Sequence, residues 1–355
     1  MNEQFSGTKE VAENLAFNLD ALNQYLEEIS SEIGRILDYK QFKGGQSNPT
    51  YQLITENKKY VLRRKPPGKL LKSAHAVDRE YRVLSALSET PVPTPKTFHL
   101  CEDDSVVGTA FYIMECCDGN IYWDPVASEV SADRRKVIFD QMNYGIASLH
   151  SQDYIALGLE DYGKPGNYIE RQVSRWSRQY FDSETEVLDS MHKLIDWLPK
   201  RMPEQKYTSI VHGDFRLDNM ILEKNKSPPS IIGLLDWELS TLSPPFIDLS
   251  YWVLMLRFEK TWPIGGLSNF NNQKSYSGIP TEEKILESYL NLTSFNKPKY
   301  WKFLLAFNCF RFAGILQGIA KRVIDGNNSG ENAYEVGEQA EPVADLGSKI
   351  LKEYL

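Results

Sequence analysis

The chain has 355 residues, 41% of them apolar and 25% charged, an ordinary composition for a globular protein and a length that allows two lobes. Its net charge of −8 argues against nucleic-acid binding, because that requires a basic surface to displace counterions. The N-terminus lacks the features of a signal peptide, no apolar run approaches a membrane span, and the four cysteines form no CxxC pair. We therefore expect a cytoplasmic protein that binds neither nucleic acid nor membrane.

The first third of the chain predicts a small β-rich part. Apolar residues spaced three and four apart indicate a helix, and runs rich in β-branched and aromatic residues around a polar turn indicate a hairpin. In chain order, we expect a weakly ordered arm over residues 1–17, a helix over 19–33, hairpin strands at 51–55 and 60–63, a helix over 74–87 and a strand over 106–114.

The rest of the chain is mainly helical in pattern. Three short apolar runs interrupt it and predict strands, at residues 210–211, 220–222 and 231–235. The predicted fold class is therefore α+β, with a β-rich N-terminal lobe over residues 18–115 and a larger, mainly helical lobe over residues 116–355.

The strongest chemical signal is a polar segment between two of these apolar runs, from His212 to Asn219, followed later by Asp236. A loop between buried strands can hold Asp214 rigidly as the base for a hydroxyl proton, and phosphoryl transfer needs such a carboxylate together with positioning and a metal. Asn219 and Asp236 supply hard oxygen ligands of the kind that magnesium binds. The alternative interpretation is structural, with turn formers and a helix cap at these positions.

This set of residues resembles the catalytic motif of the aminoglycoside phosphotransferase (APH) family. The family has a protein-kinase-like, bilobal fold with a small antiparallel sheet in the N-lobe and a larger, mainly helical C-lobe. The resemblance implies an ATP-dependent small-molecule kinase with Asp214 as catalytic base. It implies further that His212 supports the loop and that Asp248 braces it. Asn219 and Asp236 are then expected to bind Mg²⁺. Glu238 either assists a second Mg²⁺ or is a solvated acid.

The N-terminal lobe is expected to bind the nucleotide. Glu80 lies on the apolar stripe of the predicted helix over residues 74–87, where a carboxylate is costly unless it is paired. Kinases pair this glutamate with a strand lysine that contacts the phosphates of ATP. Here the strand supplies Arg63 instead, which either holds both Glu80 and a phosphate or forms only a structural ion pair with Glu80. Further nucleotide contacts are expected from the segment before the hairpin, through Gly44, Gly45, Ser47 and Asn48, and by resemblance from the hinge, through Met114, Glu115 and Cys117.

Several longer motifs are similar to one subgroup of the family, the kinase-like domains that occur alone in bacteria and fused to acyl-CoA dehydrogenases in animals. These motifs lie at residues 45–51, 62–71, 73–81 and 236–241, with Arg175-Trp176 in a helical insertion. The subgroup implies a hydroxylated acyl-CoA, such as a 4-hydroxyacyl-CoA, as the phosphate acceptor. Seven basic residues between positions 58 and 72 either attract the phosphates of ATP and CoA or form a solvated loop.

Other functions stay open on the sequence alone. The family resemblance also allows an aminoglycoside, choline or sugar-type kinase, although the helical part has no acid cluster suited to a cationic acceptor. Arg63 in place of lysine allows a nucleotide-binding pseudokinase. A protein kinase is disfavoured by His-Gly-Asp in place of His-Arg-Asp. The sequence is compatible with a monomer or a homodimer.

Overall fold

The computed structural model describes residues 6–29, 32–44, 48–68, 75–259, 261–267, 277–326 and 333–354. Their packing forms two compact units. Unit 1 comprises Met1–Asp124, Tyr154–Tyr162 and Arg216–Ser240, and unit 2 comprises Pro125–Asp153, Gly163–Phe215 and Thr241–Leu355. Because the chain returns twice to each unit, the units differ from two consecutive lobes, and the lobe boundary at residue 115 stays a prediction.

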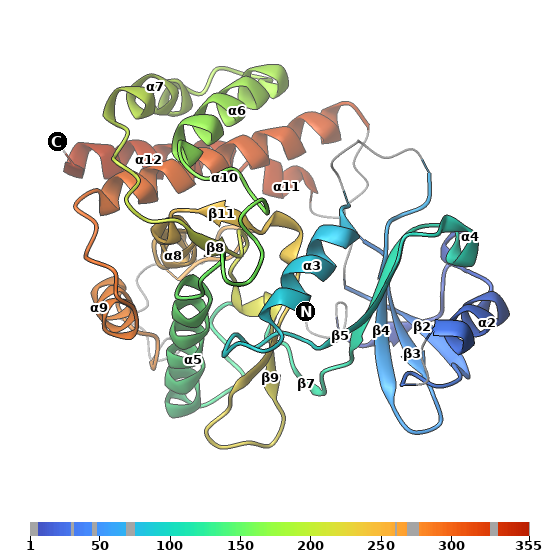
Figure 1. Cartoon of the computed structure of the whole chain (residues 1–355). Coiled ribbons are helices and arrows are strands. Elements are labelled where there is room, and N and C mark those ends of the chain that lie inside the picture. The colour runs from blue at the N-terminus through green and yellow to red at the C-terminus, as the bar shows by residue number, and fades with distance from the viewer. Residues whose placement is uncertain are drawn as a thin grey trace. The chain divides into compact units, whose positions relative to one another are not determined.

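Unit 1 is built on an antiparallel sheet whose described strands run in the order β1-β2-β3-β4-β6-β5 (Figure 1). A smaller sheet has the order β10-β9-β7, and helix α3 packs against β5 and β6. The strands are β1 (Thr8–Lys9), β2 (Asp38–Phe42), β3 (Thr50–Ile54), β4 (Lys59–Arg64), β5 (Thr97–Cys101), β6 (Phe111–Glu115), β7 (Gly119–Asn120), β9 (Met220–Glu223) and β10 (Ile231–Leu234). The helices are η1 (Glu13–Leu15), α2 (Leu19–Ile29), α3 (Val77–Leu87), α4 (Asp104–Val107), η3 (Leu217–Asn219) and η4 (Trp237–Leu239).

The local predictions for unit 1 are largely confirmed. The hairpin is present as β3 and β4, paired in register over five residues, and the later apolar runs form β9 and β10. The helix expected over residues 19–33 ends at Ile29, and the helix expected over residues 74–87 begins at Val77. The apolar stripe of each helix faces the sheet, as its spacing predicts.

The strand predicted over residues 106–114 is wrong in its first half. Asp103 caps the short helix α4 by accepting a hydrogen bond from the backbone N–H of Ser105. Gly108 ends that helix in the left-handed region, with a φ of 89°. Because these caps favour one helical turn, the strand β6 begins only at Phe111.

The segment predicted as a weakly ordered arm packs against the sheet. Strand β1 pairs with β2, and the ring of Phe17 stacks on that of Tyr39 with 4.1 Å between their centroids. The carbonyl of Leu15 accepts a hydrogen bond of 2.7 Å from the Arg64 guanidinium. The described residues 6–17 are therefore an anchored part of unit 1.

Unit 2 is mainly helical and is built around the long helix α10, which packs against α6, α8 and α12 (Figure 1). Two short strands, β8 and β11, pair in antiparallel fashion beside α8 and α5. The elements are α5 (Ala132–His150), α6 (Tyr168–Ser183), α7 (Asp189–Trp197), η2 (Leu198–Arg201), β8 (Ser209–Val211), β11 (Thr241–Ser243), α8 (Pro245–Leu254), η5 (Met255–Arg257), α9 (Glu282–Leu292), α10 (Trp301–Ile324), α11 (Ala333–Gly337) and α12 (Ala340–Tyr354).

Helix α10 qualifies the expectation that no apolar segment reaches membrane-spanning length. By length and composition its 24 residues could cross a membrane. However, 72% of its most apolar window is buried inside the structure, which is also how the core helix of a globular unit looks. Its hydropathy is explained by packing against the helices around it.

Arg64 provides a test of how unit 1 is held together. Its side chain is 3% exposed and donates to the Tyr51 hydroxyl and to the carbonyls of Leu15 and Val107. We expect Arg64→Leu to lower the free energy of unfolding by about 2–4 kcal/mol, because it leaves buried acceptors without a donor. Urea denaturation measures this change. Arg35→Leu is the control, since Arg35 is exposed and its ion pairs should contribute less than about 1 kcal/mol; equal losses in both variants would contradict the prediction.

Candidate active site

A buried cluster of charges lies in unit 1 between strand β4 and helix α3. Arg63 Nε lies 2.9 Å from Glu80 Oε2, and Arg63 Nη2 donates to Asp236 Oδ1 at 2.7 Å. Glu238 Oε2 lies 4.0 Å from the same nitrogen. The side chains of Arg63 and Glu80 are 9% and 1% exposed. The predicted pair is therefore present, and one guanidinium serves three carboxylates.

Glu80 is oriented by its neighbours as well as by the helix. Its position on the buried face of α3 follows from the apolar residues three before and four after it. Asn48 Nδ2 donates to Oε1 at 2.9 Å, and the Tyr112 hydroxyl donates to Oε2 at 3.1 Å. His75 Nδ1 in turn lies 2.9 Å from Asn48 Oδ1. The contacts of Tyr112 and His75 were not predicted, because no local sequence pattern links these residues to Glu80.

The electrostatics of the cluster favour an added positive charge. Burial raises the pKa of Glu80 to about 6, and Asp236 and Glu238 add to the shift, while Arg63 and Tyr112 oppose it. Burial alone would lower the pKa of Arg63, but Glu80 and the other acids outweigh it and raise that pKa. Arg63 therefore stays charged, and the carboxylates around it remain under-compensated.

Two of the predicted metal ligands are brought together within unit 1. The backbone N–H of Leu235, which precedes Asp236, donates to the carbonyl of Asn219 at 2.8 Å. Asn219 ends η3, and Asp236 precedes η4 with a φ of 65°, a left-handed conformation that Asp and Asn tolerate better than other side chains. Such backbone positions concentrate at functional sites.

The oxygen atoms of these residues fit Mg²⁺ as a partly hydrated ion. In the described part of the chain, no three His, Cys, Asp or Glu side chains form a complete metal cage. Mg²⁺ does not require one, since it keeps several waters and takes substrate phosphates as ligands. The amide of Asn219 and the partly exposed carboxylates of Asp236 and Glu238 offer that kind of incomplete shell.

The structure describes most of the other residues that were predicted to contact the nucleotide, but not all of them. Met114 is buried in β6, and Glu115 ends that strand. Cys117 donates its thiol to the Ile232 carbonyl at 3.6 Å, and burial raises its pKa to about 12, so it is neutral at pH 7. Their adenine contacts stay predictions. In the segment before the hairpin, Gly44 follows β2, Asn48 is buried against Glu80, and Gly45 and Ser47 lie outside the described residues.

The described members of the basic cluster predicted between positions 58 and 72 do not form one exposed cationic surface. Arg63 and Arg64 are buried and hydrogen-bonded, and Lys65 lies 3.7 Å from Asp78. Lys58 and Lys59 are exposed at the hairpin turn, and Lys69 and Lys72 lie outside the described residues. A count along the sequence cannot separate buried arginines from exposed lysines, and the attraction of these residues for phosphates stays a prediction.

The segment predicted to be the catalytic loop is braced, within unit 2, from helix α8. Asp248 is 2% exposed and accepts hydrogen bonds from the backbone N–H groups of His212, at 2.7 Å, and Gly213, at 2.9 Å. Burial would raise the pKa of Asp248, but the hydrogen bonds and charges of His150 and His212 outweigh it and lower that pKa. The contacts agree with the bracing role that the resemblance implies.

Asp214 is fixed by two partners in the same unit. The Tyr251 hydroxyl donates to Asp214 Oδ1 at 2.9 Å, and the backbone N–H of Asp214 donates to His212 Nδ1 at 3.3 Å. The second contact agrees with the support expected from His212. Tyr251 was missed, although it follows Asp248 by three residues on one helix and therefore shares its face.

The brace at Asp248 gives a stability prediction with a defined pH dependence. We expect Asp248→Asn to cost about 3 kcal/mol at pH 7, because it removes a buried charged acceptor. Since the folded-state pKa lies below the ordinary 3.8, this stabilisation is fully present above pH 3.8 and is lost as pH falls through the lower value. Urea titrations at pH 7 and pH 3 measure the difference.

The control for that experiment is Asp196→Asn on the exposed surface of α7. Asp196 is 72% exposed and pairs with Lys200, so its loss should change stability by less than about 0.5 kcal/mol at either pH. A difference between the Asp248 variant and the wild type that stays constant down to pH 3 would contradict the assigned pKa direction.

Comparison with known proteins adds a family assignment. Residues 38–279 match the model of the phosphotransferase enzyme family (APH). The chain is 41% identical to acyl-CoA dehydrogenase family member 10 of Mus musculus, over 96% of this chain and 32% of that protein. It is 38% identical to acyl-CoA dehydrogenase family member 11 of Homo sapiens, over 93% of this chain and 42% of that protein. The chain thus spans less than half the length of both relatives.

A solved structure agrees with this assignment. A Ralstonia eutropha protein, provisionally named an aminoglycoside phosphotransferase, superimposes with a TM-score of 0.87 at 42% identity, over 95% of this chain and 99% of that chain. The predicted α+β, protein-kinase-like fold is thereby confirmed. The chain belongs to the phosphotransferase enzyme family, and is a phosphotransferase that acts on a hydroxyl group of a small molecule.

Proposed function

We propose that this phosphotransferase moves the γ-phosphoryl group of ATP to a hydroxylated acyl-CoA, with a 4-hydroxyacyl-CoA as the specific acceptor. The observation that carries the nucleotide part is the set of three carboxylates around the buried guanidinium of Arg63. A fixed cation beside under-compensated acids suits a triphosphate bound together with a divalent ion.

Each residue of this cluster has a role in the proposal. Arg63, held by Glu80, donates to the phosphates of ATP through its planar fork. Asn219 and Asp236 hold Mg²⁺, with Glu238 as an additional acid. When bound, the ion neutralises charge that develops on the transferred group.

Asp214 is the proposed base. The acceptor oxygen bonds to the γ-phosphorus, the bond from that phosphorus to ADP breaks, and the hydroxyl proton passes to the Asp214 carboxylate. The contacts from Tyr251 and His212 support this role, because an orienting shell keeps a catalytic carboxylate in one position. Five residues separate Asp214 from Asn219, a step of at most about 18 Å along an extended chain.

The acyl-CoA acceptor is supported by the relatives. Both curated relatives are named acyl-CoA dehydrogenase family members, and this chain matches only part of each. A kinase part within such a polypeptide would act on the same class of compound as the acyl-CoA dehydrogenase part beside it in the sequence. We propose a cytoplasmic location as well, supported by four free cysteines of the kind that persist in a reducing compartment.

Asp214→Asn tests the base. We expect kcat on 4-hydroxyacyl-CoA to fall by about 10²–10⁴-fold, because general-base catalysis contributes on that order, with little change in the KM for ATP. Phosphorylated product is measured by mass spectrometry at saturating ATP and Mg²⁺. Asp161→Asn, an exposed carboxylate in unit 1, is the control and should leave kcat unchanged. A fully active Asp214 variant would refute the assignment.

Asp236→Asn tests the metal site with the backbone preserved, since Asn also tolerates the left-handed φ of 65°. We expect Mg²⁺-ATP to raise the melting temperature of the wild type and to lose most of that effect in the variant, following RT ln(1 + [L]/Kd). Because EDTA removes the divalent ion, it should abolish the wild-type shift. Stabilisation by Mg²⁺-ATP without turnover on any acceptor would instead favour a pseudokinase.

A further inference from the structure

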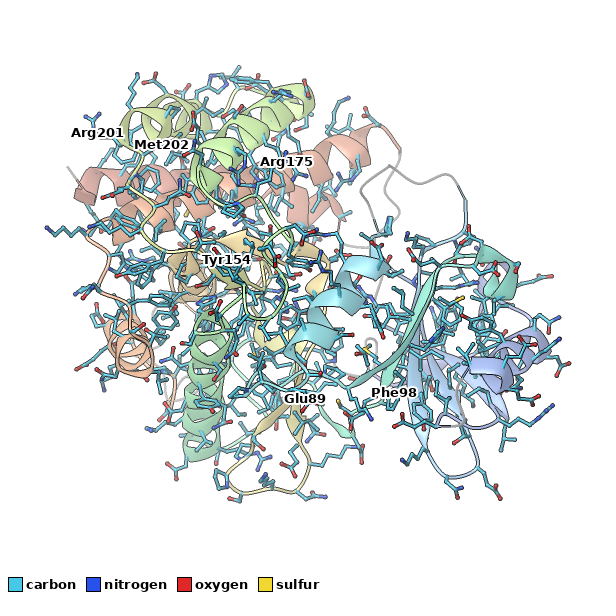
Figure 2. The ribbon with its side chains drawn as sticks, viewed as in Figure 1. Glu89, Phe98, Tyr154, Arg175, Arg201 and Met202 are labelled. Carbon is cyan, nitrogen blue, oxygen red and sulfur yellow. The ribbon has the colours of Figure 1, made fainter. Side chains whose placement is uncertain are left out.

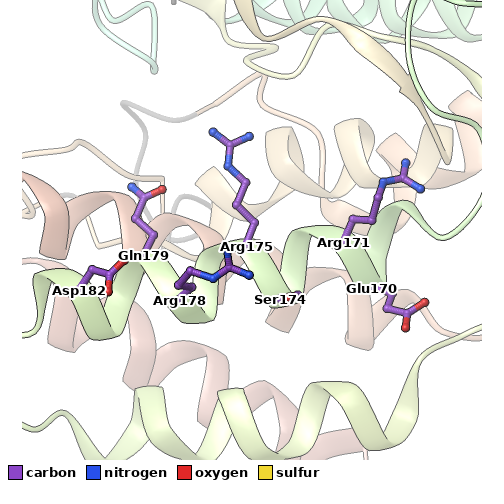
Figure 3. A pocket seen from close by; sticks show the side chains of 7 residues that line it. All are labelled: Glu170, Arg171, Ser174, Arg175, Arg178, Gln179 and Asp182. Carbon is purple, nitrogen blue, oxygen red and sulfur yellow. The ribbon is translucent and has the colours of Figure 1, made fainter. Parts of the chain in front are cut away.

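Helix α6 carries a cationic pocket that the proposed reaction does not use. The pocket lies wholly in unit 2, has a volume of about 590 Å³, and is lined by Arg171, Arg175 and Arg178, with Gln179 beside them. Figure 3 shows Arg171, Arg175 and Gln179 projecting to the same side of the helix, whereas Glu170 points to the opposite side. Glu170 therefore does not cover the arginines, and Asp182 is the second acid of the lining.

The pocket lining holds three arginines against two acids, and within the described residues no ion pair joins them, so the lining keeps a net positive charge. The Arg171 guanidinium donates to the backbone carbonyls of Lys164 and Gly166, which fix its position without cancelling its charge. Arg175 lies over the ring of Trp176, at 5.6 Å from its centroid. Within the described ranges, neither Arg175 nor Arg178 has an ion pair or a hydrogen bond through its guanidinium.

This arrangement has an energetic cost that an anionic ligand would remove. Arg171 and Arg175 are four residues apart and Arg175 and Arg178 three apart, so they are neighbours on the helix surface. Like charges at these spacings destabilise a helix, and only Arg178 has an acidic neighbour at such a spacing in the lining, Asp182 four residues later. Guanidinium groups bind phosphate oxygens in bidentate fashion, and a phosphate ester matches a pocket of this charge.

The pocket is connected to the proposed base through helix α10. Trp176 packs beside Gly314, where an added Cβ would lie 3.4 Å from its ring. Two residues earlier on α10, the Phe312 ring meets the ring of Tyr251, with 6.3 Å between centroids, and Tyr251 bonds to Asp214. The contacts of Trp176 and Phe312 both lie on helix α10, and an α-helix with its side chains is about 10–12 Å wide. We therefore expect the arginines to lie at least a helix width from Asp214. A ligand reaching both would carry its phosphates far from its reacting hydroxyl.

We infer that the α6 pocket binds the phosphorylated, nucleotide end of a CoA thioester acceptor. This inference rests on the proposed function and names the part of the chain that recognises the carrier. A CoA thioester fits because its phosphates are separated from the acyl hydroxyl by the long pantetheine arm. A polycationic acceptor such as an aminoglycoside would be repelled by the same three arginines.

The double variant Arg175→Gln/Arg178→Gln tests the inference. We expect its Kd for CoA, measured by isothermal titration calorimetry, to rise about tenfold or more, because charge-assisted hydrogen bonds are lost. The KM for 4-hydroxyacyl-CoA should rise similarly at nearly constant kcat. The KM for the corresponding pantetheine thioester, which lacks these phosphates, and the KM for ATP should not change.

Arg201→Gln is the matched control. Arg201 is another exposed arginine of unit 2 that lies over a tryptophan, at 5.9 Å from the ring centroid of Trp197. It lies well away from Arg175 (Figure 2). Its substitution removes one positive charge, half of what the double variant removes, so its effect on CoA binding reports how the general electrostatic field of the protein responds to each lost charge. We expect that effect to be less than about twofold at 0.15 M salt.

The outcomes separate this inference from the proposed function. Unchanged CoA binding in the double variant, or an equal loss in Arg201→Gln, overturns the pocket assignment even if the wild type phosphorylates 4-hydroxyacyl-CoA. Loss of CoA binding only in the double variant supports the pocket even if that acceptor is not phosphorylated. If the double variant weakens the binding of ATP as much as the binding of CoA, the pocket binds phosphates without preference. The assignment of the pocket to CoA is then wrong.

Discussion

The buried guanidinium of Arg63 is the interaction on which unit 1 depends. It joins β4 to α3 through Glu80 and to the turn after β10 through Asp236, segments that are far apart in the sequence. A buried carboxylate or guanidinium left without its partner costs several kcal/mol, so these segments are held to one arrangement. The same pairing leaves more acid than base in the cluster, a charge balance that supports the proposed binding of Mg²⁺ and ATP phosphates there.

Arginine at this position changes how the cluster is connected. A lysine ammonium is a single compact charge, whereas the guanidinium places Nε against Glu80 and Nη2 against Asp236 at the same time. Arg63 thus links the helix glutamate directly to the proposed metal ligand. This geometry weakens the interpretation that arginine in place of lysine marks an inactive nucleotide-binding protein, because a positive charge is kept where the proposal places the phosphates of ATP.

The sequence predicted those features that follow from local rules. Glu80 was found because an acid on an apolar helical stripe requires a partner, and the hairpin and catalytic segment were found from alternation and spacing. The contacts of Tyr251 with Asp214 and of His75 with Asn48 were not found, since they join segments that only the fold brings together. Residues 106–114 were misjudged because their strand propensity was weighed without the caps at Asp103 and Gly108.

Charge distribution, more than fold, discriminates among acceptors, since one fold serves many kinases. Within unit 1 the under-compensated acids around Arg63 suit a phosphate chain that arrives with its own divalent cation. Within unit 2 the exposed arginines of α6 suit phosphates that arrive without one. A kinase for cationic antibiotics would need acidic residues where α6 places guanidinium groups. The two units therefore suit two kinds of phosphate: the acidic cluster of unit 1 suits a nucleotide with its divalent ion, and the arginines of α6 suit an acceptor that carries phosphates of its own.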